Sequence, residues 1–215
     1  MRIFVFLSFL ISISSSLFGQ DPLRFEKEVA NLVASDSAVS SRKLILFTGS
    51  SSIRIWKSLK SDLPTYNTLN RGFGGSEMTD LLHYADQLII QYNPKEIFIY
   101  EGDNDLNSGK EVSDILKTAD QLLIIIRERL PKNVKVFFIS AKPSVARWAL
   151  KEKYLNYNKQ LEAWTKTAKK VYFVDVWKPL LDAQGEVLKD IYIADGLHLN
   201  EQGYKIWAGV IKNYL

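Results

Sequence analysis

The chain has 215 residues, of which 47% are hydrophobic and 24% are charged, a length and composition that suit one α/β domain rather than two. Its formal net charge of +4 is spread along the sequence without any block of five or six basic residues, so the charge gives no argument for a nucleic-acid partner. Cysteine is absent, which excludes a thiol nucleophile, a cysteine metal site and a lipoprotein anchor.

The first twenty residues, MRIFVFLSFLISISSSLFGQ, differ from the rest of the chain. One basic residue, Arg2, precedes an apolar run, which gives way to small and polar residues. The run is short for a membrane span and no stop-transfer pattern follows it. We therefore expect residues 1–20 to be a signal peptide cleaved near Gly19 or Gln20, with an uncleaved anchor helix as the alternative. Cleavage would leave one domain, residues 21–215, without a stable membrane anchor, in a secreted or periplasmic protein.

Strand and helix patterns alternate from residue 21 onward. Short apolar runs predict five strands, at residues 43–49, 65–72, 96–102, 134–142 and 171–176. Helical patterns occupy residues 23–39, 53–59, 76–91, 112–130, 149–167 and 200–213. This alternation predicts an α/β fold, a three-layer α/β/α sandwich around a five-stranded parallel sheet with flavodoxin-like strand order. Ligands bind such sheets beyond the carboxyl ends of the strands, so the loops there are the candidates for a site.

The first of these loops lies in FTGSSSIR, residues 47–54. An apolar run ends in Gly49, and three serines follow it before an amphipathic segment. Turn chemistry explains glycine and serine without any catalysis. The functional alternative is that one of the serines is a nucleophile.

The second and third loops carry glycines and amide or acidic side chains. NRGFGGSE, residues 70–77, fits a tight turn or a backbone donor for an oxyanion, and its glycine spacing does not match a phosphate-binding loop. In EGDND, residues 101–105, the Asn104 amide can donate to an oxyanion or form an Asx-turn. The acidic residues of this stretch raise a metal hypothesis, but the spacing of a D-x-D-x-D-G calcium loop is missing.

The last loop, ADGLHLN, contains Asp195 and His198 in a D-x-x-H spacing. Side chains three residues apart in a helical turn lie about 5–6 Å from each other, so the carboxylate can orient the imidazole of a general base. A local Asp–His pair at a helix start is the alternative. The only other histidine, His83, falls off the apolar stripe of its predicted helix and is expected to be solvated.

In the order of these motifs, the sequence from Leu44 to Leu215 resembles the SGNH, or GDSL-type, hydrolase superfamily. The matching blocks are Gly49-Ser50-Ser51 for G-D-S, residues 70–75 for N-x-G-x-G-G, residues 102–105 for G-x-N-D, and residues 195–198 for D-x-x-H. Ser50 departs from the pattern, since it stands where the family usually has aspartate. The resemblance implies that Ser51, Asp195 and His198 are catalytic and that Ser51, Gly75 and Asn104 form the oxyanion hole. It implies no metal and no organic cofactor.

The resemblance also implies a carboxylic ester hydrolase that works through an acyl-enzyme on Ser51. The short chain has no obvious insertion for a long acyl channel, which favours a small acyl group such as acetyl on a carbohydrate, and hence a small-molecule or glycan ester as partner. A lipolytic or lysophospholipase-like acylhydrolase and a non-catalytic glycan-binding module of the same fold are the alternatives, with a nucleotide-binding flavodoxin-like protein third. Five side chains fit either substrate contact or packing: Trp56, Arg71, Phe73, Arg147 and Trp148. The sequence does not specify the oligomeric state.

Overall fold

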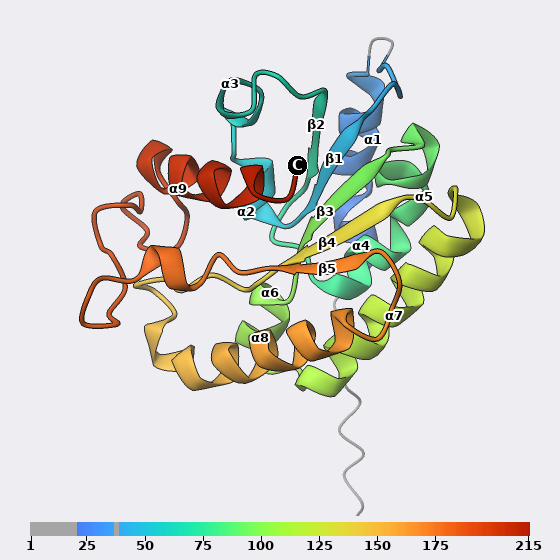
Figure 1. The fold of residues 1–215 in the computed structure, drawn as a ribbon. Helices are drawn as coiled ribbons and strands as arrows, with labels where there is room; N and C mark the ends of the chain where they lie inside the picture. The colour runs from blue at the N-terminus through green and yellow to red at the C-terminus, as the bar shows by residue number, and fades with distance from the viewer. Residues whose placement is uncertain (1–20, 37–38) are drawn as a thin grey trace, which may run out of the picture.

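The computed structural model describes residues 21–36 and 39–215, so the expected signal peptide, residues 1–20, lies outside the described residues. Within the described part, one parallel sheet has the strand order β2-β1-β3-β4-β5 (Figure 1). The strands are β1 (Ile45–Gly49), β2 (Thr68–Gly72), β3 (Glu96–Tyr100), β4 (Lys135–Ile139) and β5 (Val171–Val174). The predicted α/β fold with five parallel strands in flavodoxin-like order is confirmed.

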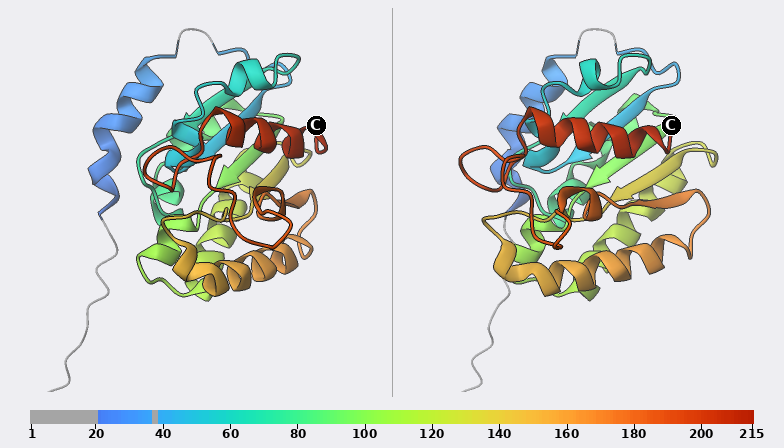
Figure 2. Two further views of the ribbon diagram at one scale, coloured as in Figure 1. Left: turned by 90° about the vertical axis from the view of Figure 1, so that its left-hand side faces the viewer. Right: turned by 60° about the vertical axis from the view of Figure 1, so that its left-hand side comes forward.

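Helices cover both faces of this sheet, as Figure 1 and Figure 2 show. The apolar core on one face is shared with α1 (Glu26–Ala34), α4 (Met78–His83), α5 (Ala85–Leu88), α7 (Val112–Arg129) and α8 (Lys151–Thr165). The core on the other face is shared with α2 (Ser51–Arg54), α3 (Leu59–Asp62) and α9 (Glu201–Lys212). No helix among the described residues combines the length and the apolar composition that crossing a bilayer requires.

Alternation along the strands explains why two separate cores form. Leu46 of β1 faces the α7 and α8 side, whereas its neighbour Phe47 faces the α9 side. On that second face Phe47, Phe98 and Phe137 from three adjacent strands stack with ring centroids 4.8 and 4.4 Å apart. Full burial of each such ring contributes about 1.5–3 kcal/mol, so the centre of the sheet is a rigid base for the loops at its carboxyl edge.

Two predicted helices are interrupted in the structure. The segment expected as one helix at 53–59 forms α2 and α3, and the indole of Trp56 and the hydroxyl of Ser58 both donate to Asp62 Oδ2, at 2.7 and 2.6 Å, across the turn between them. The segment expected as one helix at 76–91 divides at Tyr84 into α4 and α5 and ends in a 3₁₀ turn, Ile90–Tyr92. Tyr84 is buried at this break and its hydroxyl donates to the Pro22 carbonyl at 3.0 Å.

A short helix, α6 (Asp103–Asn107), follows β3 directly where the sequence indicated only a loop. Gly102 has a φ of +100° and begins this turn, and a Cβ there would lie 2.5 Å from the ring of Tyr157. Only glycine therefore fits between the strand and the helix. The tight turn puts Asp103 and Asn104 at the carboxyl edge of the sheet.

Candidate active site

Ser51 is the first residue of α2, at the carboxyl end of β1, which lies between β2 and β3 in the sheet. Gly49 ends that strand with a φ of +118°, and a Cβ on it would lie 2.1 Å from the Tyr100 carbonyl oxygen, so the position requires glycine. Ser50 is buried and its N–H donates to the same carbonyl at 3.0 Å. The strand thus turns abruptly into α2 and leaves Ser51 partly exposed, with an N–H that has no acceptor inside its own helix.

Asn70 and Gly72 at the end of β2 support this turn. Asn70 Nδ2 donates to the Ile53 carbonyl at 2.6 Å, and its Oδ1 accepts the Gly72 N–H at 2.9 Å. A Cβ on Gly72 would lie 2.2 Å from the backbone nitrogen of Arg54, so α2 rests directly on the β2 backbone. Two residues of the N-x-G-x-G-G block therefore fix the helix that carries Ser51.

His198 and Asp195 meet Ser51 in one hydrogen-bonded series. Ser51 Oγ lies 2.8 Å from His198 Nε2, and His198 Nδ1 lies 2.6 Å from Asp195 Oδ2. The other carboxylate oxygen, Asp195 Oδ1, accepts the N–H groups of Leu197 and His198 at 2.8 and 2.9 Å. Because the carboxylate accepts the Nδ1 proton, Nε2 of the neutral imidazole is the acceptor for the serine hydroxyl.

The Asp195 side chain stays charged although it takes part in this series. Burial raises its pKa, but the hydrogen bonds from the His198 ring and from two backbone N–H groups together outweigh burial and lower the pKa to about 2. The side chain is 43% exposed, and that of His198 is 20% exposed. The arrangement can therefore activate a serine hydroxyl at a site that is open to solvent.

Gly75 follows β2 and Asn104 follows β3, and these two strands are the neighbours of β1 in the sheet. The two residues therefore lie on either side of the turn that carries Ser51. A Cβ on Gly75 would lie 3.8 Å from Asn104 Nδ2, which brings the two expected oxyanion donors together. Asn104 Nδ2 also donates to the Ser76 carbonyl at 2.9 Å. The structure thus gathers Ser51, Gly75, Asn104, Asp195 and His198, all five site residues expected from the sequence, at one edge of the sheet.

The acidic residues of EGDND do not converge on a metal site. Glu101 accepts the Ser76 hydroxyl at 2.6 Å, Asp103 accepts a guanidinium N–H of Arg147 at 2.6 Å, and Asp105 accepts the Met78 N–H at 3.1 Å. Within residues 21–36 and 39–215, no three potential ligands of the His, Cys, Asp and Glu types cluster as a metal would require.

Of the five side chains that fitted either substrate contact or packing, three are buried and a fourth, Trp148, packs on another aromatic ring. Trp56 and Phe73 are fully buried in the two cores. Arg71 is buried, pairs with Asp36 and donates to the Tyr92 hydroxyl at 2.7 Å. Trp148 is half-buried and stacks on Trp177 with ring centroids 6.0 Å apart. His83 is exposed, as its place off the apolar stripe indicated.

No sequence motif indicates two contacts that hold the segments of Gly75 and Asn104, the expected oxyanion donors. Glu28 of α1 accepts the Gly74 N–H at 3.0 Å, and Phe25 packs so closely that a Cβ on Gly74 would lie 2.0 Å from its ring. Arg147, the fifth side chain of open role, donates to Asn104 Oδ1 at 3.0 Å. Both partners lie more than 40 residues from the loops they hold, so local spacing carries no signal of either contact.

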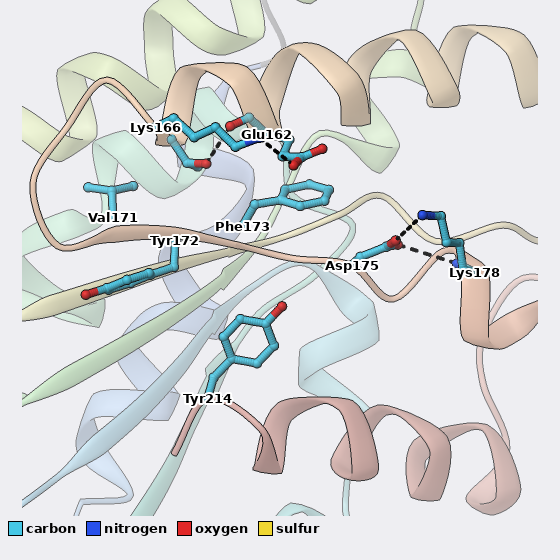
Figure 3. A pocket seen from close by; sticks show the side chains of 9 residues that line it. Glu162, Lys166, Val171, Tyr172, Phe173, Asp175, Lys178 and Tyr214 are labelled. Atoms are coloured by element: carbon cyan, nitrogen blue, oxygen red, sulfur yellow. Dashed lines mark hydrogen bonds and ion pairs between the residues drawn. The ribbon is translucent and has the colours of Figure 1, made fainter.

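A separate pocket lies along β5, the edge strand of the sheet (Figure 3). Tyr172 and Tyr214 lie on one side of the strand, while Glu162 and Lys166 form an ion pair on the other, with 2.7 Å between Lys166 Nζ and Glu162 Oε1. None of the five residues gathered around Ser51 lines this pocket.

Known proteins resemble this chain in both sequence pattern and fold. A Streptococcus pneumonia protein described as a candidate platelet activating factor superposes with a TM-score of 0.77 at 23% identity, covering 89% of this chain and 91% of its own. A GDSL-like lipase from Bacteroides thetaiotaomicron gives 0.71 at 22% identity, with 90% and 96% covered. A catalytic mutant of an acetylxylan esterase from Geobacillus stearothermophilus gives 0.65 at 13% identity, with 82% and 95% covered. No curated protein matches the sequence significantly.

These structural likenesses show a shared fold, and the sequence itself shows the family. Residues 47–206, well over half of the chain, match the GDSL-like lipase/acylhydrolase family. The matched range contains the serine turn, the glycine loop, the Asn104 turn and the Asp195–His198 loop. The protein belongs to the GDSL-like lipase/acylhydrolase family, within the SGNH superfamily.

Proposed function

We propose that the protein is an exported serine esterase that hydrolyses carboxylic esters of small acyl groups through an acyl-enzyme on Ser51. The observation that carries the proposal is the hydrogen-bonded series from Ser51 Oγ through His198 to Asp195, with contacts of 2.8 and 2.6 Å. Each member of this series lies within residues 47–206, the range that matches the GDSL-like lipase/acylhydrolase family.

In the first half-reaction the Ser51 oxygen attacks the ester carbonyl carbon while His198 Nε2 takes the hydroxyl proton. The carbonyl oxygen becomes an oxyanion that accepts from the Ser51 N–H, the Gly75 N–H and Asn104 Nδ2. His198 then gives its proton to the departing alkoxide, and an alcohol leaves the acylated serine. In the second half-reaction water loses a proton to His198 and attacks the acyl carbon, and His198 returns the proton to Ser51 as the acid departs.

The openness of the site supports a small acyl group joined to a larger alcohol. Asp195 and His198 remain 43% and 20% exposed, so a bulky alcohol can reach the serine from solvent. Two solved structures that share the fold are those of an acetylxylan esterase and of an acetyl esterase. An acetylated carbohydrate is therefore the substrate class we propose.

One observation favours the lipolytic alternative. Val145 and Ile193 are 41% and 46% exposed, and both belong to the loops around the Asp195–His198 turn. Val145 lies next to Gly196, where a Cβ would approach Val145 Cβ to 3.2 Å, and the Ile193 N–H donates to the His198 carbonyl at 2.9 Å. Two exposed apolar side chains beside a catalytic histidine can contact an acyl chain longer than acetyl.

Hydrolysis of p-nitrophenyl esters from acetate to palmitate distinguishes these functions. We expect kcat/KM to be highest for the short esters and to fall to the uncatalysed background in Ser51→Ala, with Ser61→Ala as an exposed control serine outside the site. A maximum at long chains, reduced selectively in Val145→Ser and Ile193→Ser, favours the lipolytic alternative. Activity that persists in Ser51→Ala contradicts the assigned nucleophile.

Export is proposed from the pattern of residues 1–20, in which a basic residue, an apolar run and small residues follow one another. Expression of the full chain with sequencing of the exported protein's N-terminus tests this. We expect a mature chain that begins at or near Gln20 or Asp21, whereas retention of residues 1–20 supports the uncleaved anchor.

A further inference from the structure

The side-chain amide of Asn104 is held from both of its ends. Its Nδ2 donates to the Ser76 carbonyl at 2.9 Å, and its Oδ1 accepts from Arg147 Nη2 at 3.0 Å. A carbonyl oxygen can only accept and a guanidinium can only donate, so both contacts select the same orientation of the amide. One Nδ2 hydrogen is used by the Ser76 carbonyl, and the second remains for another acceptor; a Cβ on Gly75 would lie 3.8 Å from this nitrogen.

Arg147 is itself fixed before it reaches Asn104. Its Nη1 donates to Asp103 Oδ1 at 2.6 Å and to the Asp103 carbonyl at 3.2 Å. The guanidinium therefore bridges two consecutive residues of α6, with one nitrogen on Asp103 and the other on Asn104. This use of a planar fork is specific to arginine, because a lysine ammonium cannot span both acceptors in the same way.

Asp103 is a rigid anchor for that guanidinium. It is buried and also accepts the hydroxyls of Tyr100, at 2.8 Å, and Tyr154. Burial raises the pKa of Asp103, but Lys142 and Arg147 together with the two hydroxyls outweigh burial and lower the pKa to about 2. The carboxylate therefore keeps its charge at any pH at which an esterase would be assayed.

The surroundings of Arg147 speak against a role in binding a substrate anion. Its side chain is only 14% exposed, and both terminal nitrogens already donate to protein oxygens. The fully buried Lys142 places a second cation 3.6 Å from Asp103 Oδ2, so one carboxylate stands against two cations behind Asn104.

We propose that Arg147 is a positioning residue for the oxyanion hole: it holds the Asn104 amide so that Nδ2 faces the substrate oxygen. The inference rests on the proposed ester hydrolysis and adds to it a residue that acts only through Asn104. Without Arg147 the amide loses one of its two fixed contacts and can turn its oxygen toward the developing negative charge.

A double-mutant cycle on Arg147 and Asn104 tests this role, with kcat and KM measured for the best p-nitrophenyl ester. Loss of one oxyanion donor lowers kcat by about 10²–10³-fold, and we expect a loss of this size in Asn104→Ala. We expect Arg147→Met to lower kcat by at least about 10-fold. KM should change by less than about twofold, because the oxyanion contact forms in the transition state. In the Asn104→Ala background, Arg147→Met should lower kcat by less than about threefold.

Two further variants separate orientation from charge and from folding. Arg147→Lys keeps the cation but lacks the fork, so we expect its kcat to stay close to that of Arg147→Met. Lys151→Met removes a nearby cation that lies 4.6 Å from the Trp148 ring, and we expect it to match the wild type. Thermal unfolding of each variant identifies any that fail to fold, and inhibition by a boronic acid, a mimic of the tetrahedral intermediate, should weaken in parallel with kcat.

The possible outcomes separate the positioning role of Arg147 from the proposed ester hydrolysis. Additive losses in the double mutant, or full activity in Arg147→Lys, overturn the positioning role while ester hydrolysis stands. A wild-type protein that hydrolyses no ester and binds no boronic acid overturns the proposed function, and the positioning role with it.

Discussion

Asp195 keeps its charge while remaining partly open to water, and this sets what it does for His198. Its lowered pKa of about 2 comes from hydrogen bonds that outweigh the effect of burial. A carboxyl with such a pKa is ionised from about pH 4 upward, so it does not titrate while His198 is working. The residue therefore orients the imidazole and balances the charge that the imidazole acquires.

Asp195→Asn should lower kcat by about 10⁴-fold with a small change in KM, because an amide nitrogen can donate to Nδ1 and favour the wrong tautomer. The kcat/KM profile of the wild type should show no inflection from this carboxyl between about pH 4 and pH 9. Steady-state kinetics across that range check both statements, with the exposed Asp190→Asn in the same loop as control. Equal activity of the two variants would rule out the role given to Asp195.

The helix α1 precedes the first strand of the sheet, and yet it contacts part of the site. Glu28 accepts the Gly74 N–H at 3.0 Å, and Phe25 packs edge-on against Phe73 with ring centroids 5.1 Å apart. Gly74 has a φ of +28°, so the loop turns sharply just before Gly75. The helix before the first strand thus braces the loop that supplies a proposed oxyanion donor.

Glu28→Ala should lower kcat by about 10-fold, since displacement of catalytic groups by about 1 Å can cost 10²-fold and the loop keeps its contact with Phe25. The change in melting temperature should be small, because Glu28 is only half-buried. Glu26→Ala is the matched control, an exposed glutamate on the same helix. If the two variants have the same kcat, α1 does not brace the loop.

Several buried charged side chains, among them Asp103 and Lys142, lie near the carboxyl edge of the sheet, and the stability of the whole molecule should depend on them. Asp103 is the clearest case: burial raises its pKa, but Lys142, Arg147 and two tyrosine hydroxyls outweigh burial and lower the pKa to about 2. A carboxyl whose pKa is lower in the folded state adds stability above its unfolded pKa and loses it as the pH falls through the folded pKa. For Asp103 that window runs from about pH 4 down to about pH 2.

Asp103→Asn should lower the free energy of unfolding at pH 7 by at least about 2 kcal/mol, the value of a shift from 3.8 to about 2. The loss also leaves Lys142 buried without its counter-charge. At pH 3 the difference from the wild type should shrink to about 1 kcal/mol. Urea unfolding at both pH values measures this difference in the free energy of unfolding, with Asp120→Asn, a change of an exposed residue, as the control. A difference that does not depend on pH would contradict a stabilising role for the Asp103 charge.

The parts predicted from the sequence are those that depend on the ends of strands. Ser51, Gly75 and Asn104 each follow a strand whose place in a parallel sheet was set by the alternation of apolar runs, and Asp195 and His198 are close in the chain. The Arg147–Asn104 and Glu28–Gly74 contacts join distant segments and required the fold. The breaks near Trp56 and at Tyr84 depend on bonds to Asp62 and Pro22, which the apolar periodicity does not record.

Covalent labelling of the wild-type protein with a fluorophosphonate, followed by intact-mass measurement and peptide mapping, tests whether Ser51 is the nucleophile. We predict one adduct per chain, on Ser51 and on neither Ser50 nor Ser52, with hydrolysis lost in proportion to labelling and no adduct in Ser51→Ala or after prior denaturation. An adduct on another serine, or a fully labelled protein that still hydrolyses esters, would contradict the assignment of Ser51 as the nucleophile.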